Sequence, residues 1–267
     1  MGKRPVTTAK LVEMKARGEK IVALTAYDFL LAELLDGVGI DLILVGDSLG
    51  TVFAGYESTV PVTMDQMLYH TKIVAQNAPR PLVVGDMPFM SYQASTEQAV
   101  VNAGRFLQEA GAQAVKLEGG EKVVEVIRRI TDAGIPVVGH LGVTPQSVHQ
   151  LGGYGVRGKS DSEAEKMLSD ARALEEAGAF SIVLEKIPRG LAREVTDATR
   201  IPTIGIGAGP DCDGQILVTH DMLGLFDRFR PKFARRYATM LEIARRACTR
   251  YVDDVRTGRF PADQESF

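Results

Sequence analysis

The sequence predicts a (β/α)₈ barrel, the TIM-barrel fold, built as one domain over residues 1–267. Eight short apolar runs alternate with stretches that have the periodicity of helices, and no low-complexity linker separates residues 20 and 230. Glycine recurs where a helix should end before the next apolar run. The length suits this fold, because α/β barrels routinely reach about 250 residues as one domain. A doubly wound open sheet is the alternative that these local patterns leave open.

The apolar runs have the character of parallel strands. They are rich in β-branched residues and do not alternate with polar ones, as expected for strands covered on both faces. They span residues 21–27, 42–47, 82–86, 114–120, 136–142, 181–187, 202–209 and 215–221.

Helical patterns fill most of the intervals, at residues 63–78, 95–111, 121–134 and 162–178. Gly111, Gly134 and Gly178 lie at the expected ends of three of them, where glycine commonly caps a helix. Two further helices are expected outside the repeat. Residues 7–18 should plug the bottom of the barrel, and an amphipathic helix from Lys232 to about Arg259 should extend beyond it.

Composition narrows the class of protein. The chain is 45% hydrophobic and 24% charged, which is typical of a soluble globular enzyme. A net charge of −3 gives no reason to expect nucleic acid or an anionic membrane as a partner. Cys212 and Cys248 have no metal or redox spacing and are expected to be reduced thiols. No signal peptide or membrane span is recognised, so a cytoplasmic location is expected.

Polar side chains follow five successive predicted strands at their carboxyl ends. They are Asp47, Ser48, Asp86, Lys116, Glu118, His140 and Glu185. Lys116 and Glu118 are two residues apart, so both should face the same way. Each could be a buried structural residue with a partner of its own. If the barrel closes, however, the carboxyl ends of the strands form one pocket, where the chemistry of such barrels takes place.

The carboxylates in this set require a cation. Asp47, Asp86 and Glu118 would raise one another's pKa, and Lys116 supplies only one positive charge. All-oxygen ligands suit Mg²⁺, which typically takes one or two protein carboxylates. Zinc is not expected, because His140 is the only one of four histidines at a strand end in this set.

Glu185 follows an apolar run and stands apart from the metal set. A carboxylate in such surroundings is a candidate general base with a raised pKa. The alternative for Glu185 is an ion pair with Lys186 or Arg189.

Several long motifs carry a family resemblance. They are VGDSLG, GDMPF, KLEGG, GHLGVTPQSVHQLGGYGVRGK, LEKIP and IPTIGIGAGPDCDGQILVTHDMLGL. With these motifs the chain resembles the ketopantoate (3-methyl-2-oxobutanoate) hydroxymethyltransferases from about Thr7 to Phe233. That family belongs to the phosphoenolpyruvate/pyruvate-like barrels and uses Mg²⁺.

The resemblance implies a role for each strand-end residue. Asp47 and Asp86 would bind Mg²⁺ directly, and Glu118 would complete the metal site, directly or through water. Ser48 and Lys116, together with Asp47 and Asp86, would bind the oxo acid. Glu185 would be the proton acceptor, and His140 would line the pocket without an assigned role.

The implied reaction starts from 3-methyl-2-oxobutanoate. Its Mg²⁺-stabilised enolate would attack the one-carbon unit of 5,10-methylene-tetrahydrofolate, giving 2-dehydropantoate for pantothenate and coenzyme A biosynthesis. The family is typically a homodecamer, so a homo-oligomer is expected. The chain departs from the family pattern at His149, Gly155 and Arg157, where asparagine, a basic residue and glutamine are more usual. These departures bear on loop contacts to folate or to a neighbouring subunit.

Three other functions stay open at this point. A lyase or mutase of the same superfamily would be expected to carry a reactive cysteine in a loop over the site, and neither Cys212 nor Cys248 is so placed. A Schiff-base aldolase would use Lys116 as its nucleophile. A non-catalytic barrel would be a binding or assembly module, but it should have lost site residues that are all present here.

Overall fold

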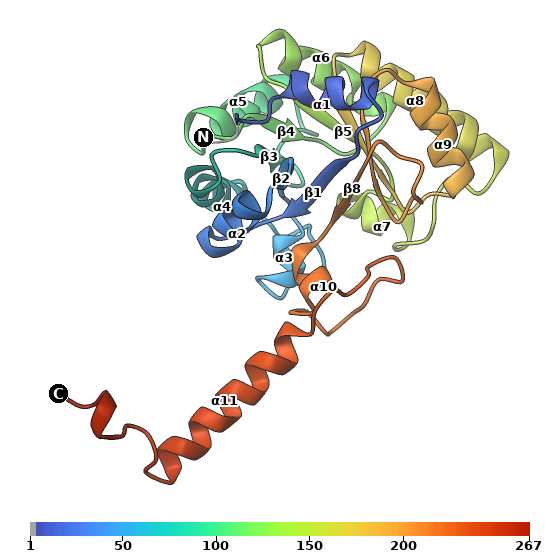
Figure 1. Ribbon diagram of the computed structural model, residues 1–267. Coiled ribbons are helices and arrows are strands. Elements are labelled where there is room, and N and C mark those ends of the chain that lie inside the picture. Colours follow the sequence, from blue (N-terminus) through green and yellow to red (C-terminus); the bar gives the residue numbers. More distant parts are fainter. Residues whose placement is uncertain (1–3) are drawn as a thin grey trace. The chain divides into compact units, whose positions relative to one another are not determined.

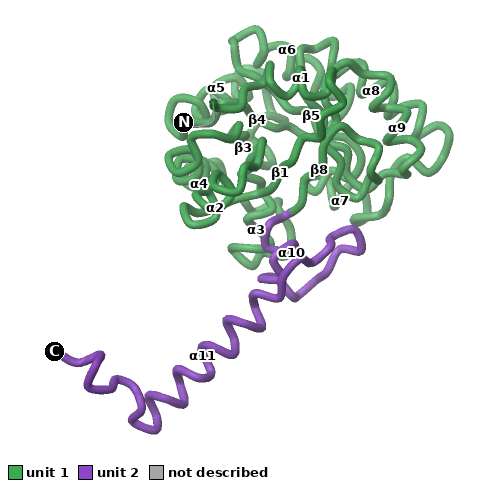
Figure 2. Tube along the Cα trace, in the orientation of Figure 1, with its two compact units in different colours: residues 1–217 green, residues 218–267 purple. Residues whose placement is uncertain are grey.

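The computed structural model describes residues 4–267, and the chain divides into two compact units (Figures 1 and 2). The first unit comprises residues 1–217 and contains every strand found in the described residues. The second unit comprises residues 218–267. A single domain over the whole chain therefore stays a prediction.

The first unit is a closed barrel of eight parallel strands in sequence order. The strands are β1 Ile21–Thr25, β2 Leu42–Val45, β3 Leu82–Asp86, β4 Ala114–Lys116, β5 Val137–Gly142, β6 Ser181–Glu185, β7 Thr203–Ile206 and β8 Gly214–Leu217. Closure comes from β8, which pairs with β1 so that Leu217 lies opposite Leu24. The barrel prediction is confirmed and the open sheet is wrong. Each strand starts within one residue of its predicted position, and most end earlier.

Helices surround the strands (Figure 1). In the first unit they are α1 Thr8–Ala16, α2 Phe29–Val38, α3 Leu49–Val52, α4 Met64–Asn77, α5 Thr96–Gln108, α6 Val124–Asp132, α7 Val148–Leu151, α8 Asp161–Glu176 and α9 Arg189–Ala198. Single 3₁₀ turns occur at Glu121–Val123 and Pro145–Ser147. Side chains cap several helix starts: Thr63 forms a capping box with Gln66 before α4, and Ser160 accepts the Glu163 N–H before α8. The predicted helix-ending glycines Gly111, Gly134 and Gly178 all have positive φ.

The interior of the barrel is apolar, and α1 contributes to it. Leu11 and Met14 of α1 belong to the same buried cluster as Ala23, Val84 and Ile216 from the strands. The expected plug at the bottom of the barrel is therefore present. Each strand sends alternate side chains inward, so the polar groups at the carboxyl ends lie above an apolar floor.

The second unit contains α10 Thr219–Leu223, α11 Met240–Arg256 and a 3₁₀ turn at Asp263–Glu265. The predicted C-terminal helix is present but starts eight residues after Lys232, at Met240. The preceding segment folds back on α10 instead: the backbone N–H of Tyr237 donates to Met222 O at 2.8 Å. Throughout residues 4–267, every helix is too short or too polar to cross a membrane.

Candidate active site

The predicted charged residues converge at the carboxyl ends of β2 to β6. Asp47 follows β2, Asp86 ends β3, and Lys116 ends β4. The register of β3 and β4 places Asp86 directly beside Lys116. Their side chains are almost completely buried, at 2% and 3% exposed. The strand pattern therefore brings opposite charges into contact inside the protein.

Lys116 is the centre of the cluster. Its Nζ lies 2.8 Å from Asp86 Oδ1, 3.4 Å from Glu118 Oε1 and 3.2 Å from His140 Nδ1. Glu118 is reached because it points to the same side of the chain as Lys116, as their spacing predicts. One ammonium group thus contacts residues from three neighbouring strands or their ends.

The cluster has too little positive charge. Four carboxyl groups, those of Asp47, Asp86, Glu118 and Glu185, interact electrostatically with Lys116 as the central cation. Burial alone would lower the pKa of Lys116, but the carboxylates of Asp86, Glu118 and Asp47 raise it above its ordinary value. Burial, opposed by Lys116 and reinforced by Asp47, raises the pKa of Glu118 to about 8. These shifts indicate a site that favours an additional cation or bound protons.

The surroundings of Asp86 also have too little positive charge. Burial raises the pKa of Asp86 well above its ordinary value; Lys116 opposes this effect, and Asp47 and Glu118 add to it. Its Oδ2 accepts the backbone N–H of Asp47 at 3.0 Å. Its buried Oδ1 makes no hydrogen bond of good geometry within the described residues and has only the ion pair with Lys116.

His140 lies between Lys116 and Glu185 and, of these two, is hydrogen bonded only to Lys116; its Nε2 makes no hydrogen bond of good geometry within the described residues. Burial, with a further contribution from Lys116, lowers the pKa of His140 well below its ordinary value, so the ring is neutral near pH 7. Because an ammonium group can only donate, Nδ1 must accept from Lys116 and Nε2 carries the proton. That Nε2 lies 3.4 Å from Glu185 Oε2.

Glu185 has a carboxyl group with a raised pKa at the end of β6. Burial raises its pKa to about 7, although Lys116 and Lys186 lower it. The alternative ion pairs are not formed within the described residues. Arg189 is paired with Asp211 at 2.6 Å, and Lys186 Nζ donates to the carbonyl of Tyr154.

Ser48 is beside the cluster but has a different partner. It follows Asp47 directly, and its hydroxyl is hydrogen bonded to the Tyr27 hydroxyl at 2.8 Å. The Tyr27 carbonyl is in turn 2.6 Å from Nδ1 of buried His70. The structure thus places Ser48 at the carboxyl end of β2, with its hydroxyl bonded to Tyr27.

Two buried residues of the site were missed from the sequence, Gln146 and Tyr92. Gln146 Nε2 donates to Asp47 Oδ2 at 3.0 Å, and its backbone N–H donates to Glu118 Oε2 at 3.0 Å. The Tyr92 hydroxyl donates to Gln146 Oε1 at 2.7 Å and accepts the backbone N–H of Glu118 at 3.1 Å. The only available signal was the position of Gln146 in the quoted GVTPQSVHQ motif, just after β5.

The donor set fits Mg²⁺. Asp47 and Asp86 are both buried, and the backbone N–H of Asp47 donates to Asp86 Oδ2. Asp86 and Glu118 both contact the ammonium group of Lys116. Within residues 4–267, no three His, Cys, Asp or Glu side chains converge into a ready-made metal cage. Mg²⁺ does not require one, because it is commonly held by one or two carboxylates with the remaining positions filled by water or substrate.

The loop that contains His149, Gly155 and Arg157 bonds to the residue after β6 and to α8. The Arg157 N–H donates to Lys186 O at 3.1 Å, and its guanidinium pairs with Glu163 at 2.6 Å. Gly155 is exposed, and His149 lies in α7. Contacts of this loop with folate or another subunit stay predictions.

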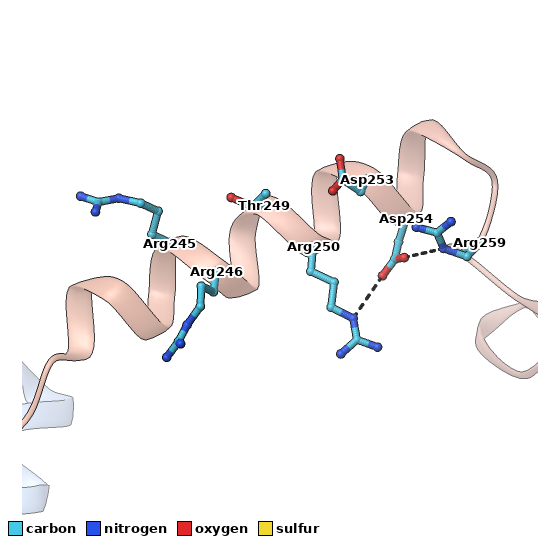
Figure 3. A pocket seen from close by; sticks show the side chains of 7 residues that line it. All are labelled: Arg245, Arg246, Thr249, Arg250, Asp253, Asp254 and Arg259. Carbon is cyan, nitrogen blue, oxygen red and sulfur yellow. Dashed lines mark hydrogen bonds and ion pairs between the residues drawn. The ribbon is translucent and has the colours of Figure 1, made fainter.

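A separate hollow lies along α11 in the second unit (Figure 3). It is lined by Arg245, Arg246, Thr249, Arg250, Asp253, Asp254 and Arg259. Asp254 pairs with both Arg250 and Arg259, at 3.8 and 2.8 Å. Such solvated ion pairs are ordinary on a helix surface, and none of the predicted site residues lies here.

Comparison with known sequences places the chain in one enzyme family. Residues 5–263 match the family model of ketopantoate hydroxymethyltransferase. A 3-methyl-2-oxobutanoate hydroxymethyltransferase of Syntrophus aciditrophicus is 57% identical over 264 residues, covering 99% of this chain and 97% of the relative. One of Moorella thermoacetica is 59% identical over 262 residues, covering 98% and 97%.

Solved structures share the fold at much lower identity. A phosphonopyruvate hydrolase in complex with oxalate and Mg²⁺ matches with a TM-score of 0.63 and 15% identity, over 97% of this chain and 93% of the other. A 2,3-dimethylmalate lyase of the PEP mutase/isocitrate lyase superfamily matches with a TM-score of 0.62 and 18% identity, over 99% and 93%. These structures show the fold alone, whereas the family match over nearly the full length shows that this chain is an enzyme of the ketopantoate hydroxymethyltransferase family.

Proposed function

We propose that the enzyme transfers a hydroxymethyl group from 5,10-methylene-tetrahydrofolate to 3-methyl-2-oxobutanoate, giving 2-dehydropantoate for pantothenate and coenzyme A biosynthesis. Family membership supports the substrate class. The structural observation that carries the proposal is the buried cluster of four carboxyl groups around Lys116, with Glu185 at its edge.

Asp47 and Asp86 would hold Mg²⁺, and Glu118 would contribute directly or through water. When bound, the metal would supply a Lewis acid that stabilises negative charge developing on the keto oxygen. The oxygen donors and the shortage of positive charge around Asp86 support this assignment.

Glu185 would remove the proton from C3 of the oxo acid. The bonding electrons pass into the keto group, and the resulting carbon nucleophile forms a bond to the methylene carbon of the folate. The bonds from that carbon to the folate nitrogens break, water supplies the hydroxyl oxygen, and tetrahydrofolate leaves with the released protons. A carboxyl group with a pKa of about 7 can accept a proton at neutral pH and return it later. Lys116 would offset negative charge beside the substrate, with Ser48 and the residues around Asp47 orienting the carboxylate.

Hydrogen exchange at C3 tests this proposal. The enzyme is incubated with 3-methyl-2-oxobutanoate in D₂O, with and without Mg²⁺, and loss of the C3 proton is followed by NMR. We expect Mg²⁺-dependent exchange that disappears in Glu185→Gln and upon addition of EDTA. If exchange is absent both alone and with tetrahydrofolate, while the protein is folded, the proposed substrate is wrong.

The geometry argues against the two catalytic alternatives. A Schiff base requires a neutral amine, whereas the surrounding carboxylates keep Lys116 protonated. Borohydride should therefore not trap the oxo acid on Lys116. A reactive cysteine is also unsupported, because Cys212 is buried just before β8, at the end of the barrel opposite the site, and burial raises its pKa.

We also propose a cytoplasmic homo-oligomer, which would be a homodecamer if it follows the family. The second unit offers one supporting observation: α11 has no buried residue, although Ile243, Tyr251 and Val255 are apolar. Light scattering coupled to size-exclusion chromatography tests the assembly, and a monomeric mass at micromolar concentration would refute it.

A further inference from the structure

Gln146 is a buried neutral residue in contact with the charged cluster. It is 3% exposed and lies in the 3₁₀ turn Pro145–Ser147 after β5. Its side-chain Nε2 donates to Asp47 Oδ2 at 3.0 Å and to Met87 O at 2.9 Å. Its Oε1 accepts from the Tyr92 hydroxyl at 2.7 Å and from Gln93 Nε2 at 3.2 Å. Both ends of the amide are therefore fully used.

These partners fix the orientation of the amide. Asp47 Oδ2 and Met87 O are both acceptors, so the NH₂ group must face them. Turning the amide over would place its oxygen against a carboxylate and a carbonyl in a buried site, which is unfavourable. Gln146 thus holds one specified oxygen of Asp47, Oδ2, in a fixed direction.

Glu118 is held by the same residue from another direction. The backbone N–H of Gln146 donates to Glu118 Oε2, while Lys116 contacts Oε1. Tyr92 completes the connection, because its hydroxyl accepts the Glu118 N–H and donates to Gln146 Oε1. The turn after β5 therefore fixes carboxylates from the ends of β2 and β4 at once.

We propose that Gln146 is a positioning residue, which sets which oxygens of Asp47 and Glu118 face the metal and the oxo acid. The inference rests on the proposed function in that it takes these carboxylates as the Mg²⁺ site. Partners that orient metal-binding carboxylates typically contribute about 10- to 100-fold to metal affinity. We expect a loss of that size when the side-chain amide is removed.

The test compares Gln146→Met with Gln93→Ala. Methionine keeps the length and most of the packing of the side chain and leaves the backbone N–H to Glu118 intact, but it removes both bonds from Nε2. The Gln93→Ala control removes a bond to Gln146 Oε1 without touching a carboxylate. Mg²⁺ is titrated calorimetrically into each protein with 3-methyl-2-oxobutanoate present, and kcat and KM are measured at saturating Mg²⁺.

We expect Gln146→Met to weaken Mg²⁺ binding about 10- to 100-fold and to recover much of its kcat at high Mg²⁺, while Gln93→Ala behaves as the wild type. A merely structural role would lower the melting temperature without changing the Mg²⁺ affinity of the folded protein. If the wild type binds Mg²⁺ and Gln146→Met binds it equally well, the positioning role is wrong and the proposed function stands.

Two further outcomes are decisive. If Gln146→Met does not fold, Tyr92→Phe replaces it, since that variant removes only the hydroxyl between Glu118 and Gln146. A loss of Mg²⁺ affinity of about threefold or more supports the proposal, in line with one lost hydrogen bond, and an unchanged affinity overturns it. If the wild type itself does not bind Mg²⁺, the metal assignment fails and this inference fails with it.

Discussion

If Glu185 is the base, as proposed, its raised pKa makes the rate of proton removal depend on pH in the neutral range. Burial raises this pKa to about 7, and only the ionised carboxylate can accept the C3 proton. The rate of exchange must therefore rise with pH. A carboxylate with an ordinary pKa near 4.5 would be fully ionised across the same range and would give a flat profile.

The size of the effect follows from the fraction of Glu185 that is ionised. With a pKa of about 7, about one tenth is ionised at pH 6 and about nine tenths at pH 8. The exchange rate at subsaturating oxo acid should thus increase about tenfold between these values. Lys186 lowers the pKa of Glu185, so Lys186→Met should move the inflection to higher pH.

The assay is deuterium exchange at C3 of 3-methyl-2-oxobutanoate, measured by NMR from pH 5.5 to 8.5 at fixed Mg²⁺ and ionic strength. Glu185→Gln supplies the background rate at each pH. Arg189→Met is the matched control, because Arg189 is paired with Asp211 and is not among the main groups that shift the Glu185 pKa. A wild-type rate that is constant over this range, or that falls as pH rises, would refute the assignment of Glu185 as the base.

Three further substitutions distinguish effects on catalytic activity from effects on the stability of the fold. Gly142→Ala should lower kcat by about 100-fold, because φ is +97° and the new Cβ would lie 2.1 Å from the Glu185 carbonyl oxygen, displacing the base; kinetics with a melting curve checks this. Glu118→Gln should stabilise the metal-free protein at pH 8 but hardly at pH 5. The pKa of Glu118 in the folded protein is about 8, so its ionisation destabilises the wild type as pH rises. Equal differences in melting temperature between variant and wild type at both pH values would contradict this. Lys15→Met should lower the free energy of unfolding by about 1–3 kcal/mol in urea denaturation and leave kcat unchanged, because its 2.9 Å pair with Asp213 lies at the opposite end of the barrel.

Much of the site could be predicted because, in a parallel barrel, all strands have their carboxyl ends on the same side. An apolar run that ends in Asp47 or Asp86 places that carboxylate at the carboxyl end of the barrel, whatever the loops do. The two-residue spacing of Lys116 and Glu118 likewise fixed a shared direction, which their contact at 3.4 Å confirms. These inferences need only the period of a strand.

Other contacts depend on loop conformation and could not be read from local pattern. Gln146 reaches Asp47 across 99 residues of sequence, through a turn whose path no periodicity specifies. Lys186 and Arg189 are closer to Glu185 in sequence, but His140 is its neighbour in space. The register of β5 and β6 places Gly142 opposite Glu185, and His140 lies two residues before Gly142 on the same face of β5. The start of α11 was wrong by eight residues, because Tyr237 bonds to Met222 instead of continuing a helix.

Two lysine–aspartate pairs, one partly buried at the bottom of the barrel and one fully buried at the top, differ in how completely their charges are paired. At the bottom, Asp213 Oδ2 receives Lys15 Nζ at 2.9 Å and the Thr203 N–H at 2.9 Å, so one carboxylate has one cation and further donors. At the top, Asp86 has Lys116 at 2.8 Å, but Lys116 must also serve the other carboxylates around it. Completed pairing makes the first pair a structural link between α1 and the strands. Incomplete pairing leaves the second pair in an excess of negative charge, which the proposed divalent cation would offset. An anionic oxo acid would then bind beside the carboxylates only once that cation is in place.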